Sequence, residues 1–446
     1  MKKSSFNAKF REYAVSKISP TETERNFVSS VYGDVCDVLG ENKCIQIGSY
    51  PRFTAIRPLH DLDVLYIIGQ YDPRGVHPEG VLKELEQKIN NEFKNSTSYE
   101  ISISLQTHSI TISFTSNGEE VFAIDIVPAY SSINKNEFGQ DTYYVPEVLR
   151  VNHGKRNQFY AEKSIHHEDM GWIKSDPRGY IEVAKRVNNS NTDFRKTVKL
   201  IKFWKQNAKS IDENVKIKSF HIEQIITSYF SEDRSLDCFD AIFKFFSNLE
   251  QYVSSAQILD RADSSKYIDE YIDKLSEIQK NKILQARDYF MVKLEIFNDA
   301  SSLDNLFTGG FYIRKSNEEN FLFEQGIPIL VDPVISFEID GWVTTKGHKN
   351  GFQKYWLSKR DNKIKLEAGV QKNIKYIITK GKKLSGLTKW KVKNDNQSEQ
   401  PRGEITDNNT RNNPESIAYK GNHYVDCFLI ENNVCIARYR RYVAVI

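Results

Sequence analysis

Residues 45–68 have the sequence IQIGSYPRFTAIRPLHDLDVLYII, and this stretch decides the fold. It predicts a short strand, a turn at Gly48 and Ser49, a polar helix-like connector, and an apolar strand that opens with two carboxylates. Because successive side chains of a strand alternate between faces, Asp61 and Asp63 are expected to point the same way. Two adjacent acids repel one another, which raises the pKa of one of them unless a cation neutralises the pair. We therefore predict a divalent metal, and such hard oxygen ligands suit Mg²⁺, with Mn²⁺ as the alternative.

A third acid, Asp125, interrupts the apolar run Val121–Pro128, which is another predicted strand. If the two strands pair, three carboxylates come together and can hold two metal ions. Such ions lie roughly 3.5–4 Å apart and stabilise the attacking and leaving oxygens of an in-line displacement. The glycine and serine of the turn, with the N–H groups of a following helix, predict a phosphate site. The competing interpretation is a surface turn with N-capping acids.

The composition places limits on domain number and partners. The chain has 446 residues, which is too long for one small core and predicts two or three domains. Its formal net charge of +3 is too small to indicate, by overall charge, a surface that binds duplex nucleic acid. Five scattered cysteines without a Cys-x-x-Cys pair favour neither disulfides nor zinc, so we predict a reducing, cytoplasmic location. No apolar run approaches about 18–20 residues, so we predict no signal peptide and no membrane contact.

The N-terminal part predicts an α+β sheet domain. Helical apolar spacing covers residues 1–42 and 79–95, and alternating β-branched runs cover 99–105, 109–115 and 120–127. The first helical segment is expected to pack on the catalytic sheet. A helix followed by mostly antiparallel strands is typical of α+β domains.

The remaining chain predicts a helical part and then a β part. Residues 193–299 have helical apolar spacing, and from about 310 short β-type runs alternate with Gly, Asn, Asp and Lys, which favours an all-β sandwich. We predict a catalytic core over 1–180, a helical nucleotide-binding domain over 181–310 and a β domain over 311–446. His166, His167 and Asp169 are interpreted as part of a solvated loop rather than as metal ligands.

Several of these motifs together resemble a known superfamily. The Gly-Ser turn, the Asp-Leu-Asp-Val segment at 61–64 and the distal Asp125 resemble the signature of the polymerase-β-like nucleotidyltransferases. Residues 171–177, 201–204 and 218–223 resemble the CD-NTases, bacterial relatives of cyclic GMP-AMP synthase and 2′-5′-oligoadenylate synthetase that carry a SMODS-type domain. Family members often have glycine where this chain has Phe53, which departs from the expected loop geometry.

The resemblance implies a set of site residues. It implies catalysis and metal binding by Asp61, Asp63 and Asp125. It implies nucleotide contacts at a second set of residues, namely Gly48, Ser49, Arg52, Thr54, Lys202 and Ser219. A cation and a hydroxyl beside a polyphosphate are suited to charge-assisted hydrogen bonds.

The C-terminal part has a resemblance of its own. Segments between Trp390 and Ala437 resemble the sensor domain fused to adenylyl/guanylyl cyclases and SMODS nucleotidyltransferases. A lysine-rich stretch over 346–383 predicts either a site for an anionic ligand or nucleic acid, or a solvated surface that discourages edge pairing. Trp356 and Trp390 are expected in the core rather than in a ligand pocket.

The resemblance implies a function as well. It implies a Mg-dependent nucleotidyltransferase that makes cyclic or linear oligonucleotide second messengers from NTPs in antiphage defence. It also implies an effector protein that reads the product and a C-terminal sensor that gates synthesis. Two alternatives stay open: nucleotidyl transfer to an RNA, DNA or protein acceptor, and a catalytically inactive nucleic-acid or ligand sensor. Three converging acids favour an enzyme, because an inactive scaffold has no need of them.

Overall fold

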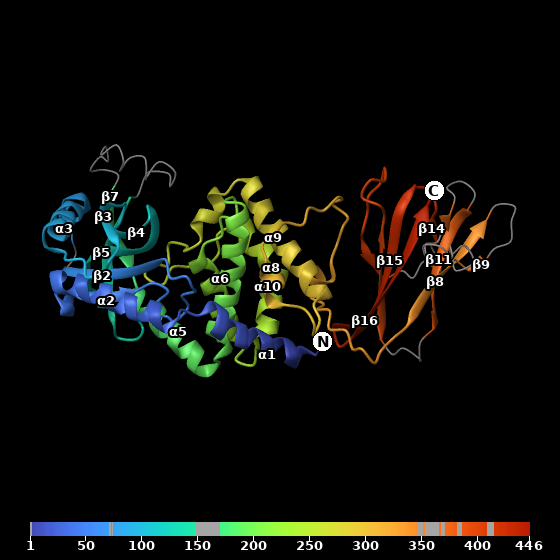
Figure 1. Cartoon of the computed structure of the whole chain (residues 1–446), viewed down its shortest axis with the longest axis horizontal. Helices are drawn as coiled ribbons and strands as arrows, with labels where there is room; N and C mark the ends of the chain where they lie inside the picture. Colours follow the sequence, from blue (N-terminus) through green and yellow to red (C-terminus); the bar gives the residue numbers. More distant parts are fainter. Residues whose placement is uncertain are drawn as a thin grey trace.

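A computed structural model describes residues 2–70, 73, 75–148, 170–345, 351–352, 365–366, 371–380, 386–407 and 414–446. These residues form three bodies in a row: a sheet with helices, a helical body and a two-sheet β body (Figure 1). The predicted α+β class with a C-terminal β part is confirmed. The predicted loop around His166, His167 and Asp169 lies outside the described residues, as does Trp356.

The N-terminal body is built on a seven-stranded sheet. Five strands follow the order β1-β2-β5-β4-β3, and β6 extends the sheet from β5 to β7. Their bounds are β1 Cys44–Ile47, β2 Asp61–Gln70, β3 Glu100–Leu105, β4 Ile110–Ser116, β5 Glu119–Lys135, β6 Asp141–Val148 and β7 Met170–Ser175. Only β2 and β5 pair in parallel, while the other ladders of this sheet are antiparallel.

Helices α2 (Glu22–Leu39) and α3 (Pro78–Glu92) pack their apolar stripes on this sheet. A capping box between Thr21 and Glu24 begins α2 by satisfying free N–H groups of its first turn. The stripe of α2 joins Leu62 and Val64 of β2 in one buried cluster. Since strand side chains alternate, the residues between those two point to the opposite, open face of the sheet.

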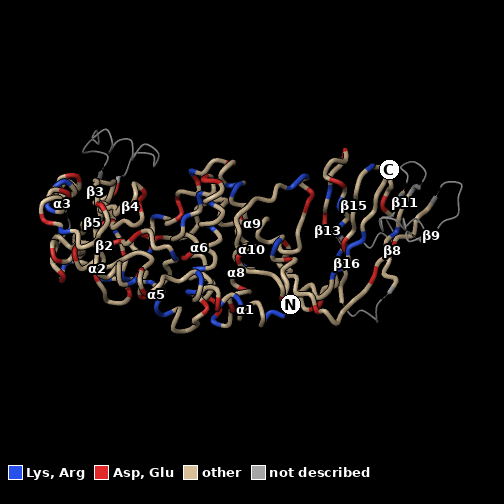
Figure 2. The backbone as a smooth tube through the Cα atoms, in the orientation of Figure 1, with Lys and Arg blue, Asp and Glu red and all other residues tan. Residues whose placement is uncertain are grey.

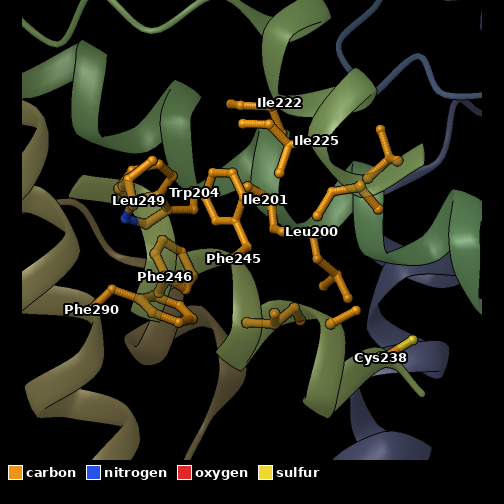
Figure 3. Packing of buried hydrophobic residues seen from close by; sticks show 14 of the residues in the cluster. Leu200, Ile201, Trp204, Ile222, Ile225, Cys238, Phe245, Phe246, Leu249 and Phe290 are labelled. Atoms are coloured by element: carbon orange, nitrogen blue, oxygen red, sulfur yellow. The ribbon is translucent and has the colours of Figure 1, made fainter. Parts of the chain in front are cut away.

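The helical body has an aromatic core. Its helices are α5 Pro177–Ser190, α6 Asp193–Ile211, α7 Ser219–Glu232, α8 Cys238–Ser254, α9 Glu277–Ile296 and α10 Leu303–Phe307. Trp204 of α6 meets Phe246 of α8 edge-to-face at 4.8 Å between ring centroids, and Phe290 of α9 packs on Phe246 at 4.5 Å (Figure 3). Such aromatic pairs add stability beyond the area that they bury.

The first helix, α1 (Lys3–Tyr13), packs in the helical body, not on the sheet. Phe6 contacts Phe239 of α8 at 5.0 Å and Phe297 at 5.4 Å between ring centroids. The prediction that residues 1–42 pack on the catalytic sheet is therefore wrong for α1, although it is right for α2. The aromatic face of α1 is matched by the phenylalanine-rich surface of the helical body, a tertiary preference that helical periodicity does not encode.

The C-terminal body consists of two sheets. One has the order β10-β16-β15-β12-β13 and the other β14-β11-β8-β9. Their bounds are β8 Glu338–Thr345, β9 Gly351–Phe352, β10 Lys365–Leu366, β11 Gln371–Lys380, β12 Leu387–Lys393, β13 Ile405–Thr406, β14 Glu415–Ser416, β15 Gly421–Glu431 and β16 Val434–Val445. Residues from both sheets, including Ile339 and Val425, form one buried cluster, which fits the predicted sandwich. Trp390 is buried in it, as predicted.

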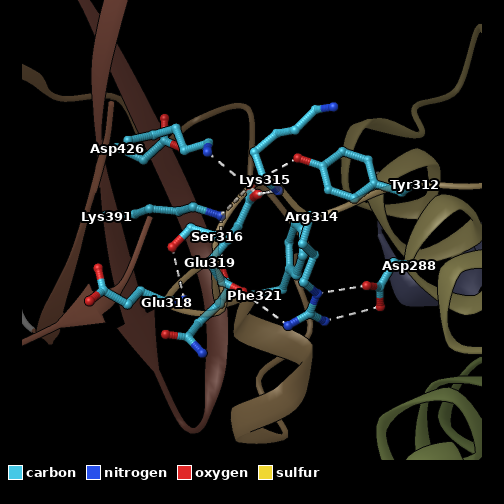
Figure 4. Close-up of polar contacts among 12 residues, drawn as sticks. Asp288, Tyr312, Arg314, Lys315, Ser316, Glu318, Glu319, Phe321, Lys391 and Asp426 are labelled. Atoms are coloured by element: carbon cyan, nitrogen blue, oxygen red, sulfur yellow. Dashed lines mark hydrogen bonds and ion pairs between the residues drawn. The ribbon is translucent and has the colours of Figure 1, made fainter. Parts of the chain in front are cut away.

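A polar network joins the helical body to the β body (Figure 4). Arg314 donates to both carboxylate oxygens of Asp288 of α9, at 2.7 and 3.1 Å, and to Glu324 at 2.6 Å. Lys391 of β12 donates to the carbonyl of Asn320 at 2.7 Å, and the buried Glu319 accepts from Tyr312 at 2.8 Å. The segment between the two bodies is thus bonded to each of them.

Charged residues of both signs are interspersed along the described chain (Figure 2), in keeping with the small net charge. No helix in the described ranges combines the length and the apolarity needed to cross a membrane.

Candidate active site

The three predicted acids share one face of the sheet. Asp63 of β2 lies directly opposite Asp125 of β5 in the parallel register, and Asp61 lies opposite Ala123. Because Asp61 and Asp63 are two residues apart on one strand, both project to the face away from α2 and α3. The predicted convergence of the strands is therefore present.

Burial and mutual repulsion perturb these acids. The pKa of Asp63 is raised to about 7, first by burial and then by the charges of Asp61 and Asp125. Asp61 is only partly buried, but this burial still raises its pKa. The negative charge of Asp125 adds to that shift. Neither Asp61 nor Asp63 has a hydrogen-bond or ion-pair partner among the described residues. The site therefore carries negative charge that a bound cation stabilises.

Asp125 is held by its neighbours on β4 and the preceding turn. The Thr111 hydroxyl donates a short hydrogen bond to one oxygen of Asp125, and the Ser109 hydroxyl lies 3.4 Å from the same oxygen. Among the described residues, no three His, Cys, Asp or Glu side chains stand at the spacing of a metal site. Carboxylate oxygens that repel one another suit a hard divalent cation. In this structure, however, the three described acids do not lie at the spacing of metal ligands.

The segment after β1 is a turn and loop. Residues 48–60 form successive turns and extended backbone, so the predicted helix-like connector and its helix N-terminus are wrong. Pro51 and Pro58 lack the N–H group that a helix interior needs, and Phe53 adopts a left-handed φ of 60°. Backbone N–H groups of the turn are instead used within it, as Thr54 N–H donates to the Ser49 carbonyl at 3.0 Å.

Gly48 lies directly against the acids. Its φ is +76°, and a Cβ built on it would lie 1.9 Å from Oδ2 of Asp63. The turn therefore requires glycine for two reasons: a backbone conformation that other residues rarely adopt, and the close approach of a carboxylate.

We expect Gly48→Ala to displace the Asp63 carboxylate and to destabilise the protein by about 2 kcal/mol or more. Urea unfolding measures the loss. The matched control is Gly33→Ala in the middle of α2, where a Cβ meets nothing within 4 Å and alanine should stabilise the helix by up to about 1 kcal/mol. Equal effects of the two substitutions would contradict the close packing assigned to Gly48.

A buried ionic network fixes this loop to the helical body. Glu223 of α7 has a fully buried side chain and accepts from Arg52 at 2.5 Å, from Lys202 at 2.8 Å and from Thr54 at 2.8 Å. Burial alone would raise the pKa of Glu223, but Arg52 and Lys202 outweigh it and hold that pKa at about 2. Three of the predicted nucleotide contacts are thus bonded to Glu223, a residue for which the sequence analysis assigned no role.

A cleft of about 600 Å³ lies between the turn and α6. Ser49, Asp61, Lys202 and Ser219 all line it, so the structure brings these predicted residues to one cavity. Gly48, Arg52, Asp63 and Asp125 do not line this cleft, and Asp125 lines an adjoining one instead.

Lys205 is a cleft residue that the sequence analysis missed. It lies one helical turn after Lys202, and its ammonium donates to the Ser219 hydroxyl at 3.1 Å. Burial and the nearby Lys209 and Lys202 lower the pKa of Lys205 to about 8. The signal was in the sequence, because an i, i+3 spacing places two lysines on one helix face.

A second cleft of about 660 Å³ adjoins the first. It is lined by the β3–β4 turn and by Thr111 and Asp125, and it shares His60 and Asp61 with the cleft on α6. Asp61 therefore lies at the boundary between two spaces, one rich in lysine and one rich in hydroxyl and imidazole groups.

Comparisons with known proteins find that the chain is similar to a C-terminal sensor domain family and to CD-NTases. A family model for the adenylyl/guanylyl and SMODS C-terminal sensor domain matches residues 319–446. The resemblance inferred from the sequence motifs is confirmed.

One curated relative is the cyclic AMP-AMP-AMP synthase of Escherichia coli strain MS 115-1, to which the chain is 26% identical over 223 residues. That match covers 49% of this chain and 59% of the relative, so it spans less than two thirds of that protein. Among solved structures, the same strain's CdnC with ATP has 18% identity and a TM-score of 0.47, covering 68% of this chain and 94% of that one. The CdnE cyclic dinucleotide synthase of Elizabethkingia meningoseptica has 14% identity and a TM-score of 0.40, covering 62% and 94%.

Proposed function

We propose that this protein is a Mg-dependent nucleotidyltransferase that joins NTPs into cyclic or linear oligonucleotides with release of pyrophosphate. The observation that carries the proposal is the set of three acids on one face of β2 and β5, beside a lysine-lined cleft. The likeness to a cyclic AMP-AMP-AMP synthase supports it. We also propose cytoplasmic synthesis in antiphage defence, an effector protein that reads the product, and gating by the C-terminal domain through its bonded connection to α9.

In this proposal the donor NTP binds the cleft on α6. Its triphosphate contacts Ser49, Lys205 and Ser219, which line that cleft, while Lys202 and Thr54 form the wall held by Glu223. Asp61 and Asp63, with Asp125, would hold the divalent cation, which when bound neutralises phosphate charge and lowers the pKa of an attacking hydroxyl.

The second cleft then receives the acceptor. A ribose hydroxyl there forms a new bond to the α-phosphorus, the bond from that phosphorus to the bridging oxygen breaks, and pyrophosphate leaves with that oxygen. We assign the hydroxyl proton to Asp125, because this acid lines the second cleft. The shared position of Asp61 between the two clefts suits a reaction that joins molecules bound on either side.

The direct test incubates the purified full chain with labelled NTPs and Mg²⁺ or Mn²⁺ and identifies products by mass spectrometry. New oligonucleotides without added RNA, DNA or protein are the expected result, and Asp61→Ala or Asp125→Ala should abolish them with little change in the melting curve. Label transferred only to an added macromolecule would favour the acceptor-modifying alternative. Salt-dependent nucleic-acid binding without turnover would favour an inactive sensor.

Lys205→Met is expected to raise the KM for NTP about 10-fold to 100-fold, because one charge-assisted contact to phosphate is lost. In the wild type, the KM should also rise above about pH 8, since the pKa of Lys205 is about 8 and the neutral amine holds phosphate weakly. Initial rates against NTP concentration at several pH values measure both effects. Lys216→Met, at an exposed lysine outside the cleft, is the control. An unchanged pH profile in the variant would contradict the assignment.

A further inference from the structure

A cavity of about 230 Å³ lies between the two sheets of the C-terminal body. Its apolar wall comes from strands of both sheets, namely Ile374 and Tyr376 of β11, Val392 of β12, and Val443 and Val445 of β16. Its polar wall is formed by Asn394, Gln400, Arg402, Glu415, Ser416, Tyr419 and His423. Apolar walls with a few placed polar groups are the usual composition of a small-molecule site.

Arg402 and Glu415 form the polar centre of this cavity. One terminal nitrogen of the Arg402 guanidinium donates a short hydrogen bond to Glu415. The Nε atom of Arg402 is buried and makes no hydrogen bond to the residues that the structure describes. A buried donor without a partner is costly, so its presence in a cavity wall points to an acceptor that the described residues do not supply, such as a bound ligand.

The described residues that line the cavity carry no net charge. Arg402 and Glu415 cancel one another, and burial lowers the pKa of His423, which keeps its ring neutral at pH 7. That ring is already engaged: Nδ1 accepts from the Asp395 N–H at 3.1 Å, and Nε2 lies 2.8 Å from the Tyr419 carbonyl. Because this described lining supplies no surplus cation, it is poorly suited to a phosphorylated ligand.

We propose that this cavity binds a small, flat, uncharged heterocycle with a lactam edge, of the size of a free nucleobase. The ligand carbonyl accepts from Nε of Arg402, and the neighbouring ligand N–H donates to Glu415, so the existing ion pair stays intact. The volume equals that of about eight waters in the liquid, which suits one ring system. A zwitterion such as an amino acid would have to separate the ion pair. This inference concerns binding alone and does not depend on the proposed transfer reaction.

The test is isothermal titration calorimetry on the full chain with four probes. Uracil and hypoxanthine carry a lactam edge, 1,3-dimethyluracil keeps the flat ring and the carbonyls but has no N–H, and leucine is a zwitterion of similar size. We expect binding of uracil or hypoxanthine at least about 10-fold tighter than that of 1,3-dimethyluracil, because the hydrogen bond to Glu415 is lost with the methylated ring. Binding by no base, equal binding of 1,3-dimethyluracil, or binding of leucine alone would overturn the proposal.

Three variants locate the binding. Arg402→Lys keeps a cation beside Glu415 but removes Nε, and should weaken binding about 10-fold or more. Ala418→Trp, at an exposed position that lines the cavity, should block entry without a change in the buried core. Lys389→Ala removes an ion pair with the exposed Asp407 on the same sheet and should leave binding unchanged. Unaltered affinity in Ala418→Trp would overturn the assignment, even if Arg402→Lys fails to fold.

Discussion

Asp63→Asn is expected to abolish nucleotidyl transfer and, in the absence of metal, to make the protein more stable near pH 8. The pKa of Asp63 is raised to about 7 by burial and by two neighbouring acids. For an acid with a raised folded-state pKa, stability is highest below about pH 4 and is lost as pH rises to about 7. The isosteric amide removes that loss, which is on the order of a few kcal/mol.

The measurement combines a product assay with melting curves between about pH 4 and 8, with and without Mg²⁺. Mg²⁺ should stabilise the wild type at pH 8 and stabilise Asp63→Asn much less, because the variant lacks the charge that the cation neutralises. Asp37→Asn, at an exposed acid of α2, is the matched control. A variant that keeps activity, or that loses stability at pH 8, would contradict the role assigned to Asp63.

Glu223→Ala is expected to lower the free energy of unfolding by about 3–5 kcal/mol, because two buried cations would lose their partner. Arg52 and Lys202 have only 8% and 5% of their side-chain surface exposed, so water cannot replace the carboxylate. Urea unfolding followed by tryptophan fluorescence suits this measurement, since Trp204 lies in the helical core. The double variant Glu223→Gln with Lys202→Met should recover part of the loss.

The pH dependence of this network has the opposite sign to that of Asp63. The pKa of Glu223 is about 2, below its ordinary value, so its contribution to stability is complete above about pH 4.5 and is lost as pH falls toward 2. Glu232→Ala on the same helix removes an exposed ion pair with Lys244 and serves as the control. A loss no greater than in Glu232→Ala would show that the network does not hold the loop.

Much of the fold followed from local patterns in the sequence. Alternation placed Asp61 and Asp63 on one face, and the single acid in an apolar run located Asp125 on a second strand, because a buried strand rarely carries an unpaired carboxylate. The β-type runs after 310 correctly indicated two packed sheets. These inferences needed only the period of a strand and the cost of burying charge.

Contacts between segments that lie far apart in the sequence could not be predicted from it. Glu223 meets Arg52 across 171 positions, and no local pattern shows that a carboxylate on one helix will bind a loop of the sheet domain. The same limitation applies to Lys202, which the sequence predicts as a phosphate contact. In the structure its ammonium is bonded to Glu223, and the ammonium of Lys205 is bonded to Ser219 instead. Pro51 and Pro58 are the local signal against the helix-like connector predicted after the Gly-Ser turn, because neither supplies the N–H group that a helix interior needs.

The position of α1 has a consequence for biosynthesis. Phe6 and Phe10 leave the ribosome before Phe239, Phe297 and Phe307, on which they pack and which lie more than 200 residues further along the chain. Translation at about 5–20 residues per second leaves this aromatic face without its partners for more than ten seconds. The nascent chain therefore exposes a binding site for chaperones. All strands of the catalytic sheet are synthesised before α1, which precedes them in the sequence, can pack on its partners.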